Sequence, residues 1–360
     1  MEMPMSRDII AISIPFSAGV ISAAYLPLGE LSLYTAASLL CVAIFLCLIY
    51  ICRRRNGLPG IILCLYLTGV LVCFSSRMSV DTDGAGWQLP RKALESLTRL
   101  IERTDLGKAE LSALLKALLT GDRTSLPNEI TEAFRESGAA HILALSGLHM
   151  GIIYGLLSGV LGVFGRSRAA LITRSALSIC ACAFYTLMTG ASPSVVRAFL
   201  FILLNELGRL CKGRSRKALN ILCTSLMIQL CISPSSATSV GFQLSYMAML
   251  GIYLLYPILD SWWPEKRWKL AGKIWSSCAL SISCQIFTAP LAWIYFRSFP
   301  VHFLITNLLA LPLTEAFMGL AVTTLLLSAL GICPDIMKDL TGTSGQILIY
   351  CVETIASISS

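Results

Sequence analysis

Two of the three histidines in this sequence, His141 and His149, stand in the run HILALSGLHMGIIY at residues 141–154. The run opens an apolar segment long enough to cross a membrane, where an ionised side chain costs about 2.5–3.5 kcal/mol and usually faces a partner or an aqueous path. Ser146 lies three residues before His149 on one helical face, as a serine nucleophile and its histidine base would require. No acidic residue lies nearby in the segment to orient the imidazole. We therefore interpret these residues as lining a path or packing helices, and expect no catalytic residue.

Arg197 follows Pro193 inside another apolar run. Its guanidinium offers forked N–H donors that match the oxygens of a phosphate group. Alternatively, it pairs with a carboxylate or with carbonyl groups and locks helices together. Glu206 lies nine residues further on, about two and a half helical turns away and on a similar face. Both interpretations are open at this point.

Other polar and small residues in the apolar runs divide between path lining and helix contact. Five amide or hydroxyl residues either face the path or form interhelical hydrogen bonds, which are routine in membrane bundles: Gln229, Gln243, Ser245, Gln285 and Asn307. Gly147 permits close helix contact or a helix break beside a cavity. A stripe suited to tight packing continues through Gly151, Gly155, Gly159 and Gly162. Pro312 and Glu315 interrupt the apolar run 301–330, which predicts either two short or re-entrant helices or a proline kink.

The composition decides which elements must position these residues. Hydrophobic residues make up 56% of the 360 and charged residues 13%, with a mean hydropathy of +0.75, which excludes a soluble globular protein. Each membrane span needs roughly 20 apolar residues. The sequence therefore predicts an all-α polytopic membrane protein with ten or eleven transmembrane helices. Its spans are 9–28, 31–51, 59–75, 140–164, 171–189, 193–210, 218–232, 241–259, 273–296 and 301–330, and 344–358 either crosses once more or lies at the surface.

Lysine and arginine gather in alternate loops between these spans. The opposite loops, near 189–194 and 233–239, hold none. By the positive-inside rule this distribution predicts a cytoplasmic N-terminus. Contact with nucleic acid is the alternative explanation for the same charges. The basic loops hold Arg53, Arg54, Arg55, Arg166, Arg168, Lys212, Arg214, Arg216, Lys217, Lys266, Arg267 and Lys269.

Residues 76–139 form the only sizeable polar stretch, which this topology places outside the cytoplasm. Leucines at helical spacing near 94–101 and 111–118 predict two short amphipathic helices that lie on the membrane surface or plug the bundle. A third helix is predicted with Ser125 as its cap, Pro127 in its first turn and Gly138 at its end. We therefore divide the chain into a three-helix membrane segment (1–75), an external helical segment (76–139) and a second membrane domain (140–360).

No cofactor is expected from the cysteines and histidines. Most of the fourteen cysteines lie in apolar runs, where they act as small hydrophobic residues. The sequence has no CxxC pair, and three histidines cannot supply a histidine-rich cluster. We expect no metal site.

The run GDRTSLPNEITEAFRESGAAHILALSGLHMG, followed in order by PSVVRAF, GFQLSYMAMLG and NLLALPL, resembles the membrane channel domain of the ComEC competence proteins. The resemblance covers residues 91–325. It implies a channel component of the bacterial plasma (inner) membrane that carries single-stranded DNA into the cytoplasm during natural transformation. On that function, the candidates for the DNA path are His141, Ser146, His149, Arg197, Gln243, Ser245 and Asn307.

Larger members of this family contain two further domains. The gap at 76–90 is too short for the five strands, about 5–6 residues each, of their DNA-binding OB fold. The sequence also lacks the HxHxDH cluster of their metallo-β-lactamase-like nuclease domain. We therefore expect a channel or transport protein rather than an enzyme, whether a reduced relative, a truncated product or a diverged transporter. A transporter or flippase of another anionic substrate is the alternative, and a membrane-embedded hydrolase is a third interpretation.

The sequence contains no motif that would supply energy for transport. It contains no GxxxxGK[ST] loop, and an inside-negative potential opposes an entering phosphate by about 2.3 kcal/mol per charge per 100 mV. We therefore expect a cytoplasmic ATPase or single-strand-binding proteins at the basic loops 209–217 and 264–273. An external DNA receptor, membrane lipid and a second copy forming a homodimer complete the expected partners.

Overall fold

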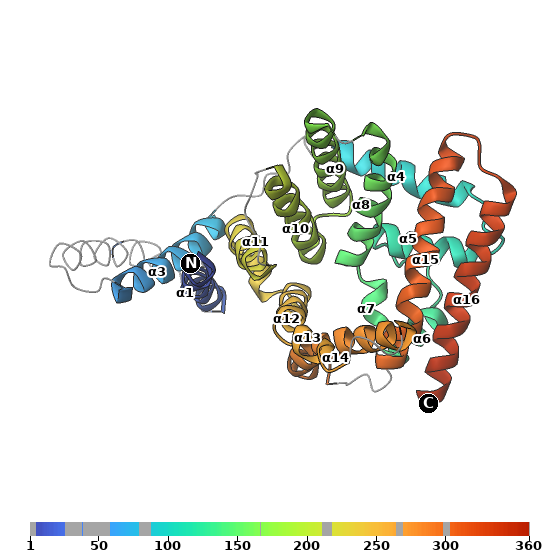
Figure 1. Ribbon diagram of the computed structural model, residues 1–360. Helices are drawn as coiled ribbons and strands as arrows, with labels where there is room; N and C mark the ends of the chain where they lie inside the picture. The colour runs from blue at the N-terminus through green and yellow to red at the C-terminus, as the bar shows by residue number, and fades with distance from the viewer. Residues whose placement is uncertain are drawn as a thin grey trace.

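The computed structural model describes residues 5–25, 38, 58–78, 88–165, 167–210, 218–263, 269–297 and 303–359, and throughout these ranges it contains helices and no strand (Figure 1). The all-α prediction is confirmed. The helices are α1 (Met5–Tyr25), α3 (Leu58–Met78), α4 (Gln88–Arg103), α5 (Ala109–Thr120), α6 (Asn128–Glu136), α7 (Ala140–Leu143), α8 (Gly147–Leu161), η2 (Gly162–Phe164), α9 (Arg168–Met188), α10 (Pro193–Leu210), α11 (Ala218–Ile232), η3 (Pro234–Thr238), α12 (Val240–Leu254), α13 (Tyr256–Asp260), α14 (Lys269–Phe296), α15 (Phe303–Ala329) and α16 (Asp335–Ser359).

Three helices are long and apolar enough to cross a membrane: Arg168–Met188, Leu270–Phe296 and Phe303–Ala329. Shorter apolar helices occupy five further segments, Ile9–Tyr25, Ile61–Phe74, Gly147–Leu161, Ala218–Ile232 and Val240–Leu254. The count of ten or eleven spans stays a prediction. The predicted span 31–51, the basic clusters at 53–55, 212–217 and 264–268, and Arg166 lie outside the described residues.

The largest hydrophobic core surrounds α5. Eight of the twelve residues of α5 are buried, among them Leu111, Leu114 and Leu118. They pack with residues of α6, α15 and α16. Of the two placements predicted for this helix, the structure shows the one inside the bundle, because a helix that is apolar on nearly every side must be covered on every side. The predicted tail 344–358 belongs to α16, whose Leu348 and Val352 are buried in the same core.

Glycines allow the helices around this core to approach closely. A Cβ atom added at Gly345 of α16 would lie 2.8 Å from Leu111 of α5 and 2.8 Å from the ring of Phe317 of α15. One added at Gly342 would lie 2.7 Å from the backbone oxygen of Leu106, in the turn between α4 and α5. These contacts leave no room for a side chain, so they fix the position of α16 against the core.

A second core joins α1, α3, α11 and α12. Phe16 and Val20 of α1 pack with Phe74 of α3, Leu230 of α11 and Phe242 of α12. A third, smaller cluster joins α8, α9 and α10 through Met150, Cys182, Tyr185 and Val195. The chain segments that carry the sequence motifs are therefore held together by direct helix packing.

Two predicted helix boundaries need correction, and a third was open between two alternatives. The predicted span 140–164 is not one helix, because the chain leaves the helical conformation between α7 and α8. Of the two alternatives at Pro312, the break into two helices is not found: α15 is continuous, and Ala310 and Phe317 on either side are buried, so packing outweighs the lost backbone hydrogen bond. Ser125 does not cap α6, which begins at Asn128 after Pro127, although Gly138 with a φ of +81° does end it.

Candidate functional site

The SGLH motif forms the N-terminus of α8. Ser146 is the N-cap, its hydroxyl accepts from the backbone N–H of Leu148 at 3.2 Å, and the ring Nδ1 of His149 accepts from the backbone N–H of Ser146 at 3.0 Å. Both side chains thus satisfy backbone donors in a reciprocal capping arrangement. This is the reason for the break that the sequence did not predict. His141, on α7, is exposed, and its Nδ1 lies 3.1 Å from the backbone oxygen of Gly138.

The serine and histidine do not form a hydrolytic site in the described residues. His149 is fully buried, and its Nε2 has no hydrogen-bond partner there. Because Nδ1 accepts a backbone N–H, the ring proton must be on Nε2, and no carboxylate receives it. A nucleophile and base would need that third group to orient the ring. The hydrolase interpretation therefore gains no support from the geometry.

Arg197 of α10 is the point at which three motifs meet. Its side chain is buried, and Nη1 donates to the backbone oxygen of Ser245 in α12 at 2.5 Å. The guanidinium carbon lies 6.0 Å from the ring centroid of Tyr246, within range of a cation–π contact. A Cβ atom added at Gly147 of α8 would lie 3.4 Å from Nη2. The elements SGLH, PSVVRA and GFQLSY, far apart in the sequence, therefore converge on one guanidinium.

Arg197 has no carboxylate partner within 4 Å among the described residues. The pairing with Glu206, one of the alternatives that the sequence left open, is not found, because that carboxylate binds other groups. Of the two forms of helix locking considered from the sequence, the structure shows the contact with a carbonyl oxygen. A backbone carbonyl carries no net charge, so the positive charge of Arg197 is not neutralised by it.

Glu206 is the centre of a separate polar cluster that sequence reasoning missed. The hydroxyl groups of Tyr154 in α8 and Ser175 in α9 donate to its carboxylate, and Arg209 Nη1 donates to it at 2.8 Å. Its side chain is 3% exposed. One carboxylate thus ties α8, α9 and α10 together. The only signal in the sequence was the presence of these polar groups within apolar runs.

The amide side chains mostly serve as interhelical hydrogen-bonding groups. Gln243 donates to Tyr25 of α1 at 2.7 Å and accepts from Tyr295 of α14 at 2.8 Å. Gln229 donates to the backbone oxygen of Pro193 at 2.9 Å and accepts from a tyrosine hydroxyl. The backbone of Ser245 binds Arg197, whereas Asn307 has a buried Oδ1 with no hydrogen-bond partner in the described part of the chain.

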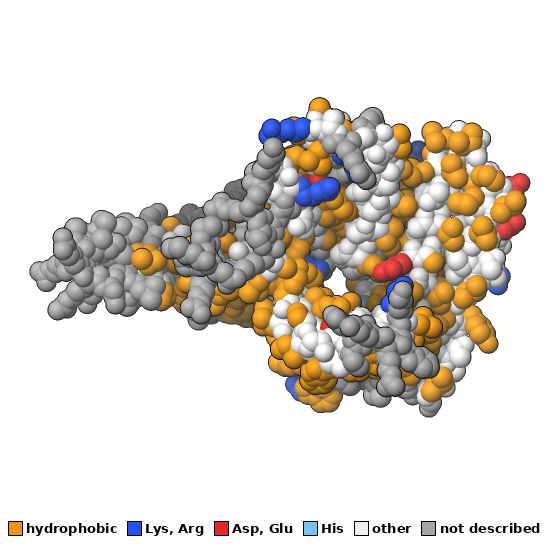
Figure 2. All heavy atoms as spheres, in the orientation of Figure 1, with side chains coloured by type: hydrophobic (Ala, Val, Ile, Leu, Met, Phe, Trp, Pro, Cys, Tyr) orange, Lys and Arg blue, Asp and Glu red, His pale blue; other side chains and the backbone are white. Residues whose placement is uncertain are grey.

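The glycines of α8 face open space rather than another helix. Gly151 and Gly155 are exposed, and a Cβ atom added at either would meet nothing within 4 Å. A Cβ atom added at Gly159 or Gly162 would likewise meet nothing within 4 Å, so the predicted tight packing is wrong for the whole stripe within the described chain. Figure 2 shows this face of the molecule hollowed between α8, α12 and α15, with charged side chains of both signs near the margin. Bare backbone is thus exposed at Gly151 and Gly155 on this side of α8.

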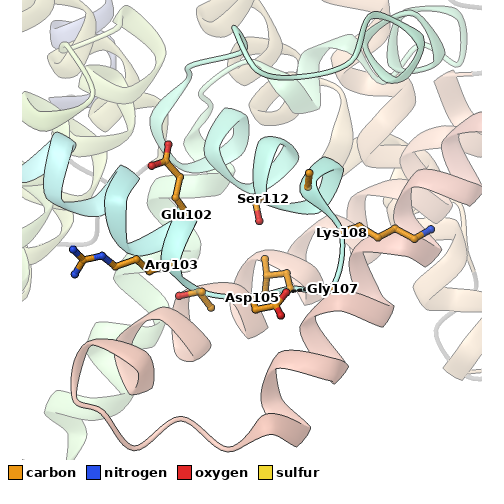
Figure 3. Close-up of a pocket in the computed structure, with 9 residues that line it drawn as sticks. Glu102, Arg103, Asp105, Gly107, Lys108 and Ser112 are labelled. Carbon is orange, nitrogen blue, oxygen red and sulfur yellow. Dashed lines mark hydrogen bonds between the residues drawn. The ribbon is translucent and has the colours of Figure 1, made fainter.

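A polar pocket of about 270 Å³ lies at the turn between α4 and α5 (Figure 3). Glu102, Asp105, Lys108 and Ser112 contribute to its lining, and the Lys108 side chain extends away from the others. The backbone N–H of Gly107 donates to Asp105 at 2.9 Å, which closes the turn. All the lining residues come from this one turn, and none belongs to the motifs around Arg197. We do not include it in the candidate site.

A family model described as Competence protein matches residues 118–360, more than half of the chain. The chain belongs to the Competence protein family. The match includes SGLH, PSVVRA and GFQLSY, the three elements that meet at Arg197. The family resemblance inferred from these elements is therefore confirmed. No solved structure matches the chain.

Three curated relatives support this membership. ComE operon protein 3 of Bacillus subtilis (strain 168) is 30% identical over 204 residues, which cover 56% of this chain and 24% of that protein. The uncharacterized protein YcaI of Escherichia coli (strain K12) is 27% identical over 222 residues, which cover 59% of this chain and 28% of that protein. A protein of Aquifex aeolicus (strain VF5) is 26% identical over 251 residues, which cover 69% of this chain and 55% of that protein. The matches thus span about a quarter of the first two proteins and about half of the third.

Proposed function

We propose that this Competence-family chain forms part of a conduit that passes single-stranded DNA across the bacterial inner membrane into the cytoplasm. The observation that carries the proposal is the Arg197 site. A buried guanidinium, bound by a neutral carbonyl and a tyrosine ring and facing no carboxylate within 4 Å among the described residues, has charge left for a phosphate. Its contacts are also few enough for a phosphate to be released again.

The glycine surface of α8 supports the same proposal. A strand moving through a conduit must contact the wall without binding tightly at any one position. The exposed Gly151 and Gly155 follow Gly147, where an added Cβ atom would lie 3.4 Å from the Arg197 guanidinium. Without side chains, this surface allows the sugar-phosphate backbone to approach closely. The arginine and the glycines would then form consecutive parts of one path.

Transport of another anionic substrate is the second candidate function, because the same guanidinium would bind any phosphate or carboxylate group. The membrane-embedded hydrolase is not favoured. Ser146 and His149 are used in capping α8, and no carboxylate orients the imidazole in the described residues. Competition in the uptake assay separates the first two, since only a DNA conduit should show uptake that excess unlabelled DNA abolishes and small anions do not.

The test is DNA uptake by cells that carry Arg197→Gln, Arg197→Lys or the matched control Arg135→Gln, compared at equal protein abundance. Removing hydrogen bonds to a charged group costs about 1.5–3 kcal/mol, which predicts a reduction of roughly tenfold or more for Arg197→Gln. Arg197→Lys keeps the charge but loses the forked geometry and should show an intermediate reduction. Arg135, whose side chain is 72% exposed on α6, should tolerate the change. Uptake by Arg197→Gln equal to the control at equal abundance would refute the proposal.

The proposed conduit needs partners to supply force and substrate. The sequence holds no nucleotide-binding P-loop, so we propose a cytoplasmic ATPase or single-strand-binding proteins at the exit and an external DNA receptor at the entrance. The inside-negative potential gives the physical reason, because it opposes entry of a polyanion. Robust ATP hydrolysis by the purified chain alone in liposomes would contradict this arrangement.

A further inference from the structure

The segment between α4 and α7 is attached to the bundle at two distant levels. Near one end of α15, the hydroxyl of Thr306 donates to the backbone oxygen of Ser137, just after α6, at 2.5 Å. Near the other end, Gly342 of α16 packs against the backbone of Leu106, in the turn between α4 and α5. These two contacts fix where the beginning and the end of this segment lie along the bundle.

The separation of the two levels can be worked out along α15. Thr324 of α15 hydrogen-bonds to Thr341 of α16 at 2.8 Å, so Gly342 lies close to the level of Thr324. From Thr306 to Thr324 the helix rises by about 27 Å at 1.5 Å per residue. The hydrocarbon core of a bilayer is about 30 Å thick. Since α15 is one of the helices that can cross a membrane, segments docked at these two levels lie near opposite surfaces.

Helix α5 connects the two levels through the interior. Its twelve residues give a length of about 18 Å, and its two flanking turns cover the remainder. At its far end the backbone oxygen of Leu119 accepts from the Tyr185 hydroxyl at 2.9 Å, near the end of α9. Its one cation, Lys116, is 17% exposed and pairs with Asp122 at 3.0 Å. The helix is therefore covered by protein and carries no unpaired charge into the interior.

Helix α4 lies across the end of the bundle rather than along it. Figure 1 shows α4 crossing the ends of α9 and α15 near the connection from α8 to α9, whereas α6 and α7 lie at the opposite end. Its apolar Leu97 and Leu100 pack on the core, and its outer face exposes four cations and two carboxylates. This is the distribution expected of a helix at a membrane surface. The outer charges are Arg91, Lys92, Glu95, Arg99, Glu102 and Arg103.

We propose that α4 is a membrane-surface helix whose cations contact lipid headgroup phosphates on the side of the α8–α9 connection, and that α5 carries the chain through the bundle to α6 on the opposite side. The segment 76–139 then has two sides instead of being wholly external. Because the loop at 166–168 carries basic residues, the positive-inside rule places α4 on the cytoplasmic side, which replaces the external position that the three predicted N-terminal spans gave to this part of the chain. This proposal does not depend on the transport of DNA.

Cysteine accessibility tests the sidedness. Ser96 lies exposed on α4 and Ser125 lies exposed between α5 and α6, so Ser96→Cys and Ser125→Cys place matched thiols at the two levels. Each variant is treated with a membrane-impermeant maleimide in intact cells and in inside-out vesicles, with the parent chain giving the background from its own cysteines. We expect Cys labelling at position 125 only from outside and at position 96 only from inside. Labelling of both positions from the same side would overturn the proposal.

A second measurement tests the lipid contact. An environment-sensitive fluorophore on Ser96→Cys is measured in vesicles of phosphatidylcholine and phosphatidylglycerol, with and without a lipid carrying a nitroxide on its headgroup. We expect the nitroxide to quench at least half of the emission, because Lys92 and Arg99 flank this position on the same face. Absence of quenching would show that α4 faces water or protein and would overturn the headgroup contact.

Discussion

Replacement of Glu206 by alanine should destabilise the packing of α8, α9 and α10. The carboxylate accepts from Tyr154, Ser175 and Arg209, and its side chain is 3% exposed. Each hydrogen bond to a charged group contributes about 1.5–3 kcal/mol. The side chain of Arg209 is 48% exposed, so water can hydrate its guanidinium when the carboxylate is removed. Its contribution to the free energy of unfolding is therefore that of a surface ion pair, roughly 0–1 kcal/mol. The two hydroxyl donors therefore dominate, and we expect a loss of about 3 kcal/mol.

The assay is thermal unfolding of the purified protein in detergent, followed by loss of monodisperse material. A loss of 1 kcal/mol lowers the melting temperature by about 2–4 °C in chains of about 150–250 residues. The melting temperature of the Glu206→Ala variant should therefore be lower by roughly 5 °C or more. Glu206→Gln keeps one acceptor oxygen and should lose about half as much. Glu353→Ala, on the exposed side of α16, serves as the matched control and should change little. A melting temperature for Glu206→Ala equal to that of the control would refute the reasoning.

Two further predictions concern the α5 region. Gly342→Ala should lower the melting temperature, because the added Cβ would lie 2.7 Å from the backbone oxygen of Leu106, whereas Gly319→Ala, with nothing within 4 Å, should not; equal effects would contradict the close contact. Hydrogen bonds from Thr124, together with Lys116, lower the pKa of Asp122 from 3.8 to about 2. The ionised form therefore stabilises the fold above pH 3.8 and loses this effect as the pH falls towards 2. Thermal unfolding of Asp122→Asn beside the parent should show a difference at pH 6 that shrinks on acidification through this range, and a constant difference would be inconsistent with it.

Several parts of the site could be predicted because they depend on residue type. A lone arginine in an apolar run indicates a specific contact wherever it lies, and Arg197 proved to be the meeting point of three motifs. Its partner could not be predicted. Glu206 had a plausible spacing along α10, but hydroxyl groups from two other helices and Arg209 occupy it. Spacing along one helix gives the face of a residue and says nothing about which helix covers that face.

Predictions of helix boundaries were least successful where the local conformational preference of the chain and its tertiary packing favour different structures. Local chemistry left either a break or a kink open at Pro312, and buried neighbours keep α15 continuous. The run through residues 140–164 predicted continuity, yet Ser146 and His149 cap a new helix inside it. Apolar periodicity cannot detect such a turn, because its stabilising hydrogen bonds involve only two polar side chains.

The sequence by itself determined the helical class, the family and the residue types that bear charge inside apolar segments. These properties follow from composition and local order, since the free energy of burying an apolar or charged side chain depends mainly on the side chain itself. Only the tertiary structure decided which groups meet: Arg197 with Gly147 and Ser245, and α5 with the interior of the bundle. The physical reason is that helix packing depends on complementary shape between surfaces that are distant in the chain. Whether a small residue such as Gly342 or Gly345 is required at its position depends on the atoms that pack against it, which the sequence does not show.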